Sequence, residues 1–119
     1  MSEEVYDKLY DRPSVNIIGE NEQMNEIIKD RLIESQFYSS VHIDTVKNEN
    51  TDITVCASLS KYNELNAYYG IKVLFTGAAK HVIGLANIDS ETLIIYKSLN
   101  SIQDLPQKIY NYYIKTKGK

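Results

Sequence analysis

The side chains of this chain that could take part in catalysis are few and widely spaced. Its two histidines are His42 and His81, and its single cysteine is Cys56. His42 and Asp44 stand two residues apart in a predicted strand and so share one face, where a solvated His–Asp pair is common. Cys56 lies in an apolar run and is predicted to be an inert core thiol, because a reactive thiolate needs a nearby base or helix N-terminus. We therefore predict no catalytic residue and no multi-cysteine metal site.

The turn at Gly19 is the part of the sequence that most resembles a nucleotide-binding motif. The apolar run at residues 15–18 leads through Gly19 into an amphipathic helix that Asn21 can cap, as in nucleotide-binding α/β domains. The fingerprint G-x-G-x-x-G is incomplete, because Asn21 and Met24 stand where its other two glycines would be. Asp44, 25 residues after Gly19, could still accept a bond from a ribose hydroxyl. Gly19 and Asp44 are thus the candidate cofactor-binding residues of a degenerate site, and we expect no bound cofactor.

Length and charge narrow the class of protein. The 119 residues suit an N-terminal arm at residues 1–13 and a single domain at residues 14–119. A formal net charge of −3 gives no basic footprint for nucleic acid or for an anionic membrane surface. No apolar stretch approaches the roughly 20 residues that span a bilayer, and the acidic N-terminus has no apolar leader segment. We expect a cytoplasmic protein that binds neither nucleic acid nor membrane.

The hydrophobic pattern alternates strands and helices and then changes. After the first strand and helix, it predicts strands at residues 39–46, 52–57 and 71–75, with a helix before Gly70. Two later strands, at residues 81–86 and 92–96, are predicted to pair as a hairpin. The chain then ends in a helix for which Pro106 favours Asp104 as the cap, because proline is harmless only in the first turn. The expected fold is α/β: a Rossmann-like, mostly parallel sheet with helices on both faces, a late β-hairpin and a C-terminal helix.

Three tyrosines on the last helix are the candidate partner-binding residues. Tyr110, Tyr112 and Tyr113 could form an exposed aromatic surface of the kind that binds a protein or peptide. Core packing explains Tyr112 and Tyr113 equally well. A homodimer or a heterodimer is compatible with such a surface, and a sheet edge is the other way in which a peptide could be held.

Four short motifs follow one another in residues 50–92. They are Asp52 with Ile53, Leu65 with Asn66, the segment GIKV at residues 70–73, and Ile83 with Gly84 followed eight residues on by Thr92. In this order they resemble the core of the ThiF-like, ubiquitin-activating-enzyme-like superfamily, and most of all its divergent members encoded with thiazole/oxazole-modified bacteriocins. With the first strand and helix, the resemblance covers roughly residues 14–99. It implies a partner or scaffold in peptide modification that binds a precursor peptide or a cyclodehydratase.

The sequence also departs from that family. The family's zinc cysteines would fall at Ile94 and Lys97, and its arginine and asparagine cluster has no counterpart in residues 45–50. Together with the missing glycines, these departures imply a degenerate domain that keeps the fold without adenylation, and hence a non-catalytic protein.

A second resemblance is to the receivers of response regulators. The segment FTG at residues 75–77, and Lys97 before the last helix, are similar to the ends of the fourth and fifth receiver strands. However, Gly19 and Glu20 replace the acidic pair expected after the first strand, and the phospho-acceptor aspartate would fall at about Ala57. This resemblance implies a pseudo-receiver signalling domain that lacks the phospho-acceptor.

Overall fold

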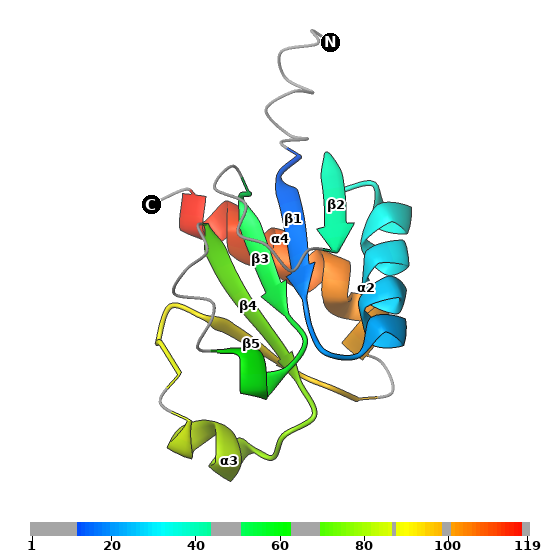
Figure 1. The fold of residues 1–119 in the computed structure, drawn as a ribbon. Helices are drawn as coiled ribbons and strands as arrows, with labels where there is room; N and C mark the ends of the chain where they lie inside the picture. The colour runs from blue at the N-terminus through cyan, green and yellow to red at the C-terminus, as the bar shows by residue number, and fades with distance from the viewer. Residues whose placement is uncertain (1–11, 44–50, 63–69, 87, 99–100, 118–119) are drawn as a thin grey trace, which may run out of the picture.

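The computed structural model of the chain describes residues 12–43, 51–62, 70–86, 88–98 and 101–117. These residues form five strands and three helices (Figure 1). The elements, in chain order, are β1 (Ser14–Ile18), α2 (Glu22–Ser35), β2 (Ser40–Ile43), β3 (Ile53–Cys56), β4 (Ile71–Thr76), α3 (Lys80–Leu85), β5 (Leu93–Tyr96) and α4 (Ser101–Lys117).

The five strands form one parallel sheet in the order β2-β1-β3-β4-β5. β1 therefore lies between β2 and β3, with Val15 paired to Val41 on one side and to Ile53 on the other. This is the flavodoxin-like order of doubly wound α/β folds. The dinucleotide-binding order 3-2-1-4-5-6 differs, because there β1 lies between β2 and β4. The prediction of a Rossmann-like α/β fold with a parallel sheet is confirmed.

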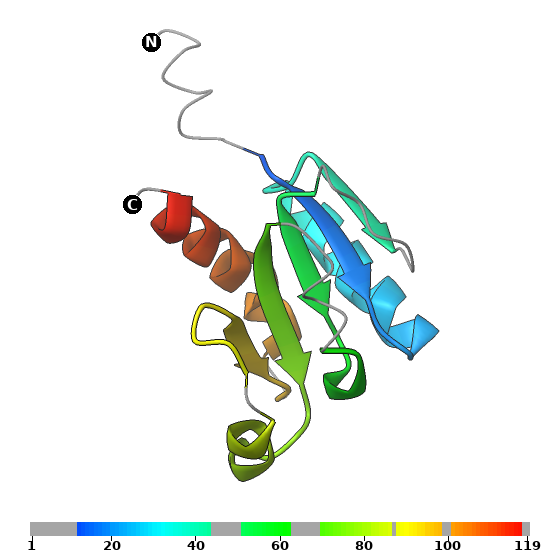
Figure 2. The ribbon, with the colours of Figure 1, turned by 60° about the vertical axis from the view of Figure 1, so that its left-hand side comes forward.

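The main core lies between one face of the sheet and the helices α2 and α4, which also pack against each other (Figure 2). Ile17, Val55 and Phe75 from the strands meet Leu32 of α2 and Ile109 of α4, and none of these five is exposed. A smaller cluster covers the other face, where Ile83 of α3 packs with residues such as Leu74 and Cys56. Helices thus lie on both faces, as predicted.

The predicted late hairpin is wrong. Residues 80–85 form the helix α3 instead of a strand, and β5 pairs with β4 in parallel, with Leu74 opposite Ile94. A parallel pair needs a crossover connection, and α3 lies in that crossover between β4 and β5. Ile83 is the one buried residue of α3, so the apolar residues of this segment show little helical periodicity. The sequence pattern therefore indicates a strand where the structure has a helix.

The last helix begins three residues before the predicted cap. α4 starts at Ser101, and Pro106 lies inside it. Proline in a helix interior removes one backbone hydrogen bond, but tertiary contacts hold this turn. Tyr38 donates its hydroxyl to the carbonyl of Pro106 at 2.6 Å, and Arg31 donates to the carbonyl of Gln103 at 2.9 Å.

One predicted helix end is present in the described residues. Asn21 caps α2, because its side-chain oxygen accepts the amide of Met24 at 3.0 Å. Gly70 has a φ of 86°, a left-handed conformation. The helix predicted before it falls mostly on residues 63–69, which lie outside the described part of the chain.

Candidate functional site

Four connections meet where the parallel strands end. Gly19 follows β1, Ala57 follows β3, Thr76 ends β4 and Lys97 follows β5. In open α/β sheets the carboxyl ends of the strands, next to the point where the strand order reverses, form the usual ligand site. Here that point lies between β1 and β3, so Gly19 and Ala57 are its central residues. Ala57 donates its amide to the carbonyl of Ile18 at 2.8 Å, which holds the two turns together.

The turn at Gly19 is filled by a neighbouring side chain. Asn25, which is 3% exposed, donates its Nδ2 to the carbonyl of Gly19 at 3.0 Å. A Cβ at position 19 would lie 2.5 Å from Oδ1 of Asn25 and 3.1 Å from Cβ of Ala57. At the start of α2, the side chain of Asn21 already binds the amide of Met24. Gly19 is needed here for the close packing of strand and helix, and the amide of Met24 that could face a phosphate has a partner.

Two serines after β3 form a short hydrogen-bond chain that ends on an acid. Ser58 and Ser60 share a hydrogen bond of 2.8 Å, and Ser60 donates to Glu20 Oε1 at 2.7 Å. Cys56 is fully buried, and its thiol donates to the carbonyl of Ser58 at 2.9 Å. The sequence did not predict these hydrogen bonds. Their only local signal is a pair of serines just after a buried strand.

Thr76 and Lys97 lie side by side at the ends of β4 and β5. Lys97 donates its amide to the carbonyl of Thr76 at 2.8 Å, and the Thr76 hydroxyl accepts the amide of Ala78 at 3.0 Å. Nζ of Lys97 is 5.5 Å from the centroid of the Phe75 ring, a cation–π distance. At the ends of β4 and β5, the described residues thus include the exposed ammonium group of Lys97 and a hydroxyl that is already bonded.

The arrangement gives no basis for covalent or metal chemistry in the described residues. Within them, no three histidine, cysteine or acidic side chains come close enough to hold a metal ion. His42 and His81 are both exposed, one on β2 and the other in α3. Asp44, the second predicted cofactor-binding residue, lies outside the described residues.

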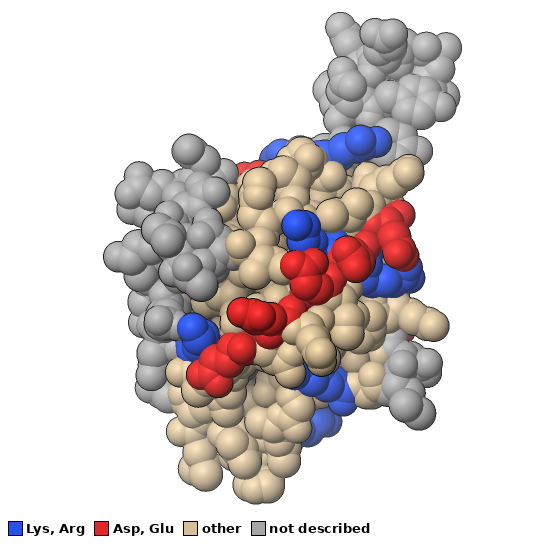
Figure 3. Space-filling model, turned by 45° about the vertical axis from the view of Figure 1, so that its right-hand side comes forward, with Lys and Arg blue, Asp and Glu red and all other residues tan. Residues whose placement is uncertain are grey.

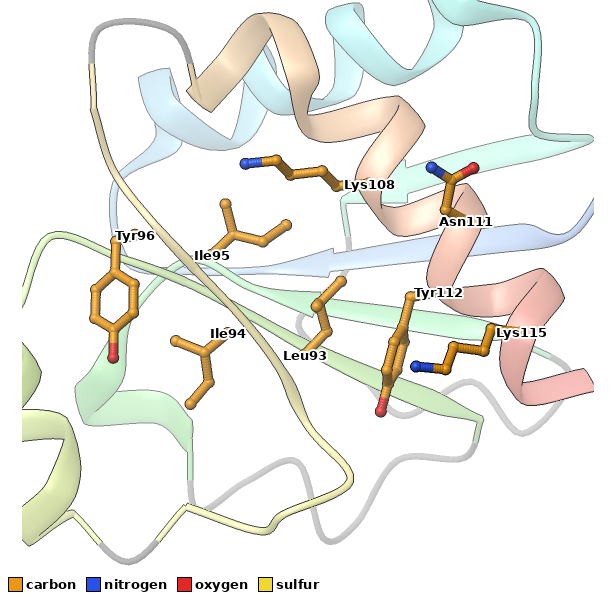
Figure 4. A pocket seen from close by; sticks show the side chains of 8 residues that line it. All are labelled: Leu93, Ile94, Ile95, Tyr96, Lys108, Asn111, Tyr112 and Lys115. Carbon is orange, nitrogen blue, oxygen red and sulfur yellow. The ribbon is translucent and has the colours of Figure 1, made fainter.

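A second candidate site lies at the edge of the sheet, between β5 and α4. It is a groove of about 470 Å³ (Figure 4). The β5 side is formed by all four strand residues, and the α4 side by Lys108, Asn111, Tyr112 and Lys115. These α4 residues recur at i, i+3, i+4 and i+7, so the helix period alone could have grouped them on one face.

The structure divides the three predicted partner-binding tyrosines. Tyr113 is buried, and Tyr110 is half-buried and stacks on Phe37 with ring centroids 5.1 Å apart. With Tyr38 they form an aromatic cluster between α2 and α4. Tyr112 alone lines the β5–α4 groove, where its hydroxyl donates to the carbonyl of Glu91.

No family model matches the chain, and no curated protein matches it. Among the described residues, no helix combines the length and apolar character that a membrane crossing requires.

Proposed function

We propose that this chain is a non-catalytic binding module with the layout of a response-regulator receiver that lacks its phospho-acceptor. The observation that carries the proposal is the carboxyl edge of the sheet. Flavodoxin-like order, which response-regulator receivers share, places Thr76 and Lys97 at the ends of β4 and β5. Gly19 and Ala57 stand at the ends of β1 and β3, where such a receiver would carry its acidic residues.

Among the described residues, the end of β3 lacks the group that would accept a phosphoryl group in a receiver. A phospho-acceptor must be a carboxylate or another nucleophile, and the methyl group of Ala57 is neither. Mg²⁺ prefers carboxylate oxygens, and the acid nearest in sequence to the first turn, Glu20, accepts a hydrogen bond from Ser60. What remains is a folded surface that can contact another protein. Since a fold alone does not define a function, the proposal depends on these positions and not on the strand order by itself.

A ThiF-like scaffold in bacteriocin modification is the second proposal. Its support is the turn at Gly19, where Asn25 and Asn21 occupy the space and the amide that a nucleotide phosphate would use. This filling agrees with a domain that has kept its fold without adenylation. We place it second because the strand order is not that of dinucleotide-binding folds.

Acetyl phosphate and beryllofluoride, each with Mg²⁺, test the first proposal. We expect no covalent phosphoryl group in the intact mass of the protein and no stoichiometric binding of beryllofluoride by ¹⁹F NMR. An active receiver treated in parallel serves as the positive control for both reagents. Labelling of the chain, or saturable beryllofluoride binding that shifts the amides of Gly77 and Lys97, would show an active receiver and overturn the proposal.

A further inference from the structure

β5 is a short sheet edge of four residues that carries no charge or proline to block pairing. Within the described residues it pairs with β4 alone. Its sequence, LIIY, has neither a charge nor a proline, which are the residues that commonly block an exposed edge. Because Lys97 donates its amide to Thr76, the alternation of a parallel ladder turns the backbone groups of Ile94 and Tyr96 away from β4. These groups are placed to accept another strand.

The helix beside this edge adds positive charge. Lys108 and Lys115 are exposed on α4, on either side of Tyr112 along the groove (Figure 4). The groove residues include no acid. The ion pair found within the described residues, Arg31 with Glu34, lies on α2. Both lysines are therefore available to a ligand.

The acidic side chains gather elsewhere on the molecule. Figure 3 shows a band of Asp and Glu side chains over α2, which packs at the β1–β2 end of the sheet. Glu22, Glu26 and Asp30 are exposed there at a spacing of four residues. The residues that line the β5–α4 groove thus carry two positive charges and no negative one, in a chain with a net charge of −3. Complementary charge favours an acidic occupant.

A second copy of this chain is a poorer occupant. If two β5 edges paired across a two-fold axis, the α4 helices of the two copies would meet. Lys108 and Lys115 would then approach the same residues of the other copy, and like charges repel.

We propose that the β5–α4 groove binds an extended acidic segment of a partner protein, which adds to β5 as a sixth strand and places its carboxylates near Lys108 and Lys115. The two lysines are seven residues apart, or about 10 Å along a helix. Side chains on one face of a strand repeat every ~7 Å, so acids at alternate positions can reach both lysines. This inference rests on the proposed function as a binding module and specifies its partner.

Two labelled peptides test the charge preference with the full chain. A capped fluorescein-labelled peptide EVEVEVEV should bind in a fluorescence anisotropy titration, and binding should weaken with added salt because the contact is partly ionic. The peptide KVKVKVKV, with the same label, should not bind. The double variant Lys108→Glu, Lys115→Glu should lower the affinity for the acidic peptide by about tenfold or more. The matched control, Lys29→Glu with Lys61→Glu, makes the same change in net charge away from the groove and should bind nearly as the parent does.

The backbone contact needs a separate measurement. Methylation of alternate peptide nitrogens removes strand hydrogen bonds and should abolish binding, while hydrogen exchange at Ile94 and Tyr96 should slow when the unmodified peptide is bound. Equal affinity for the lysine peptide, no difference between the two double variants, or unchanged exchange at β5 would overturn the inference. Light scattering that shows a dimer unable to bind the peptide would also overturn the inference. The groove would then be assigned to a second copy of the chain. The phosphorylation tests are independent of these readouts, so a failed peptide experiment leaves the proposed function standing.

Discussion

Asn16 is an unsatisfied polar residue in the middle of β1. It is fully buried, and neither Nδ2 nor Oδ1 has a hydrogen-bond partner. It lies between His42 of β2 and Thr54 of β3 in the register of the sheet. Burying an amide without a partner costs about 1–3 kcal/mol, so this position works against the stability of the fold.

Replacing this amide should therefore stabilise the protein. We expect Asn16→Val to raise the free energy of unfolding by about 1 kcal/mol, because valine fills similar space and suits a buried strand. Urea denaturation measures the change. Asn25→Val is the matched control and should lower stability by a similar amount, since Nδ2 of Asn25 serves the carbonyl of Gly19. A loss of stability in both variants would show that the amide of Asn16 has a role of its own.

Tyr38 makes stability depend on pH in the alkaline range. Burial raises the pKa of Tyr38 well above its usual value, and the neighbouring Tyr110 raises it further. The folded state therefore favours the neutral phenol. Its contribution is complete below the unfolded pKa of about 10 and is lost as the pH rises toward the folded value.

The variant Tyr38→Phe separates this effect from the hydrogen bond to Pro106. At neutral pH it should lower the free energy of unfolding by about 1 kcal/mol, because the carbonyl of Pro106 loses its donor. Above about pH 10 its stability should fall less steeply than that of the parent. Chemical denaturation at several pH values measures both the free energy of unfolding at neutral pH and its decrease above pH 10. Parallel pH curves for the two proteins would assign the alkaline loss to other tyrosines.

At the level of single residues, local chemistry predicted much of what the structure shows. The cap at Asn21 and the burial of Cys56 depend on neighbours in sequence, and both are confirmed. The partners of Tyr110 and Tyr113 were beyond prediction, because Phe37 and Tyr38 are more than 70 residues away in the chain. Only the docking of α2 on α4 brings these rings together.

Among the elements, β4 depends on the glycine that precedes it. Gly70 has a φ of 86°, and a Cβ there would clash with the carbonyl oxygen of Asp52. The adjacent amide of Ile71 donates to that same oxygen at 2.9 Å. The chain therefore enters β4 through a backbone conformation that an L-residue with a side chain rarely adopts.

Two glycine substitutions test this requirement. Gly70→Ala should lower the free energy of unfolding by about 2 kcal/mol or more, from both backbone strain and the clash with Asp52. Gly84→Ala, in α3, should instead raise it by about 0.5–1 kcal/mol, because nothing lies within 4 Å of the added methyl group and alanine favours a helix. Thermal unfolding of both variants is the measurement. Equal effects at the two sites would contradict the role assigned to Gly70.

The sequence predicted the elements that have a strong hydrophobic pattern. It did not predict those whose conformation depends on contacts with residues far away in the chain. β3 and α2 have long apolar runs or stripes, and their existence follows from sequence. α3 is six residues long and has no side-chain cap, so its helical state depends on the crossover it belongs to. Pro106 lies inside α4, where Tyr38 and Arg31 bind the carbonyl groups of Pro106 and Gln103 from other parts of the fold.

For the whole molecule, strand order was the property that the sequence could not provide. Local patterns predict strands but not their neighbours, since each crossover is a long-range event. The β5–α4 groove follows from that order, because β5 is an edge only when β4 is its sole neighbour. Tyr112 was predicted as a partner-binding residue from its place on the last helix. Lys108 and Lys115, which line the groove with it, were not predicted.

The filled turn at Gly19 leads to a prediction about nucleotides. We expect Mg-ATP at millimolar concentration to leave the melting temperature of the protein unchanged, because the space and the amide that a phosphate needs are occupied by Asn25 and Asn21. Differential scanning fluorimetry with a known ATP-binding protein as control measures this. A clear upward shift would mean that a nucleotide binds the folded state and would favour an active enzyme.

The contacts between α2 and α4 also affect how the protein is made. Arg31 and Tyr38 bind carbonyl groups 72 and 68 residues later in the chain. During synthesis, the face that α2 presents to α4 therefore remains uncovered until residues 101–117 have left the ribosome. At a usual elongation rate of about 5–20 residues per second, the nascent chain exposes this apolar surface for several seconds. Chaperones that recognise apolar segments would have that interval in which to bind.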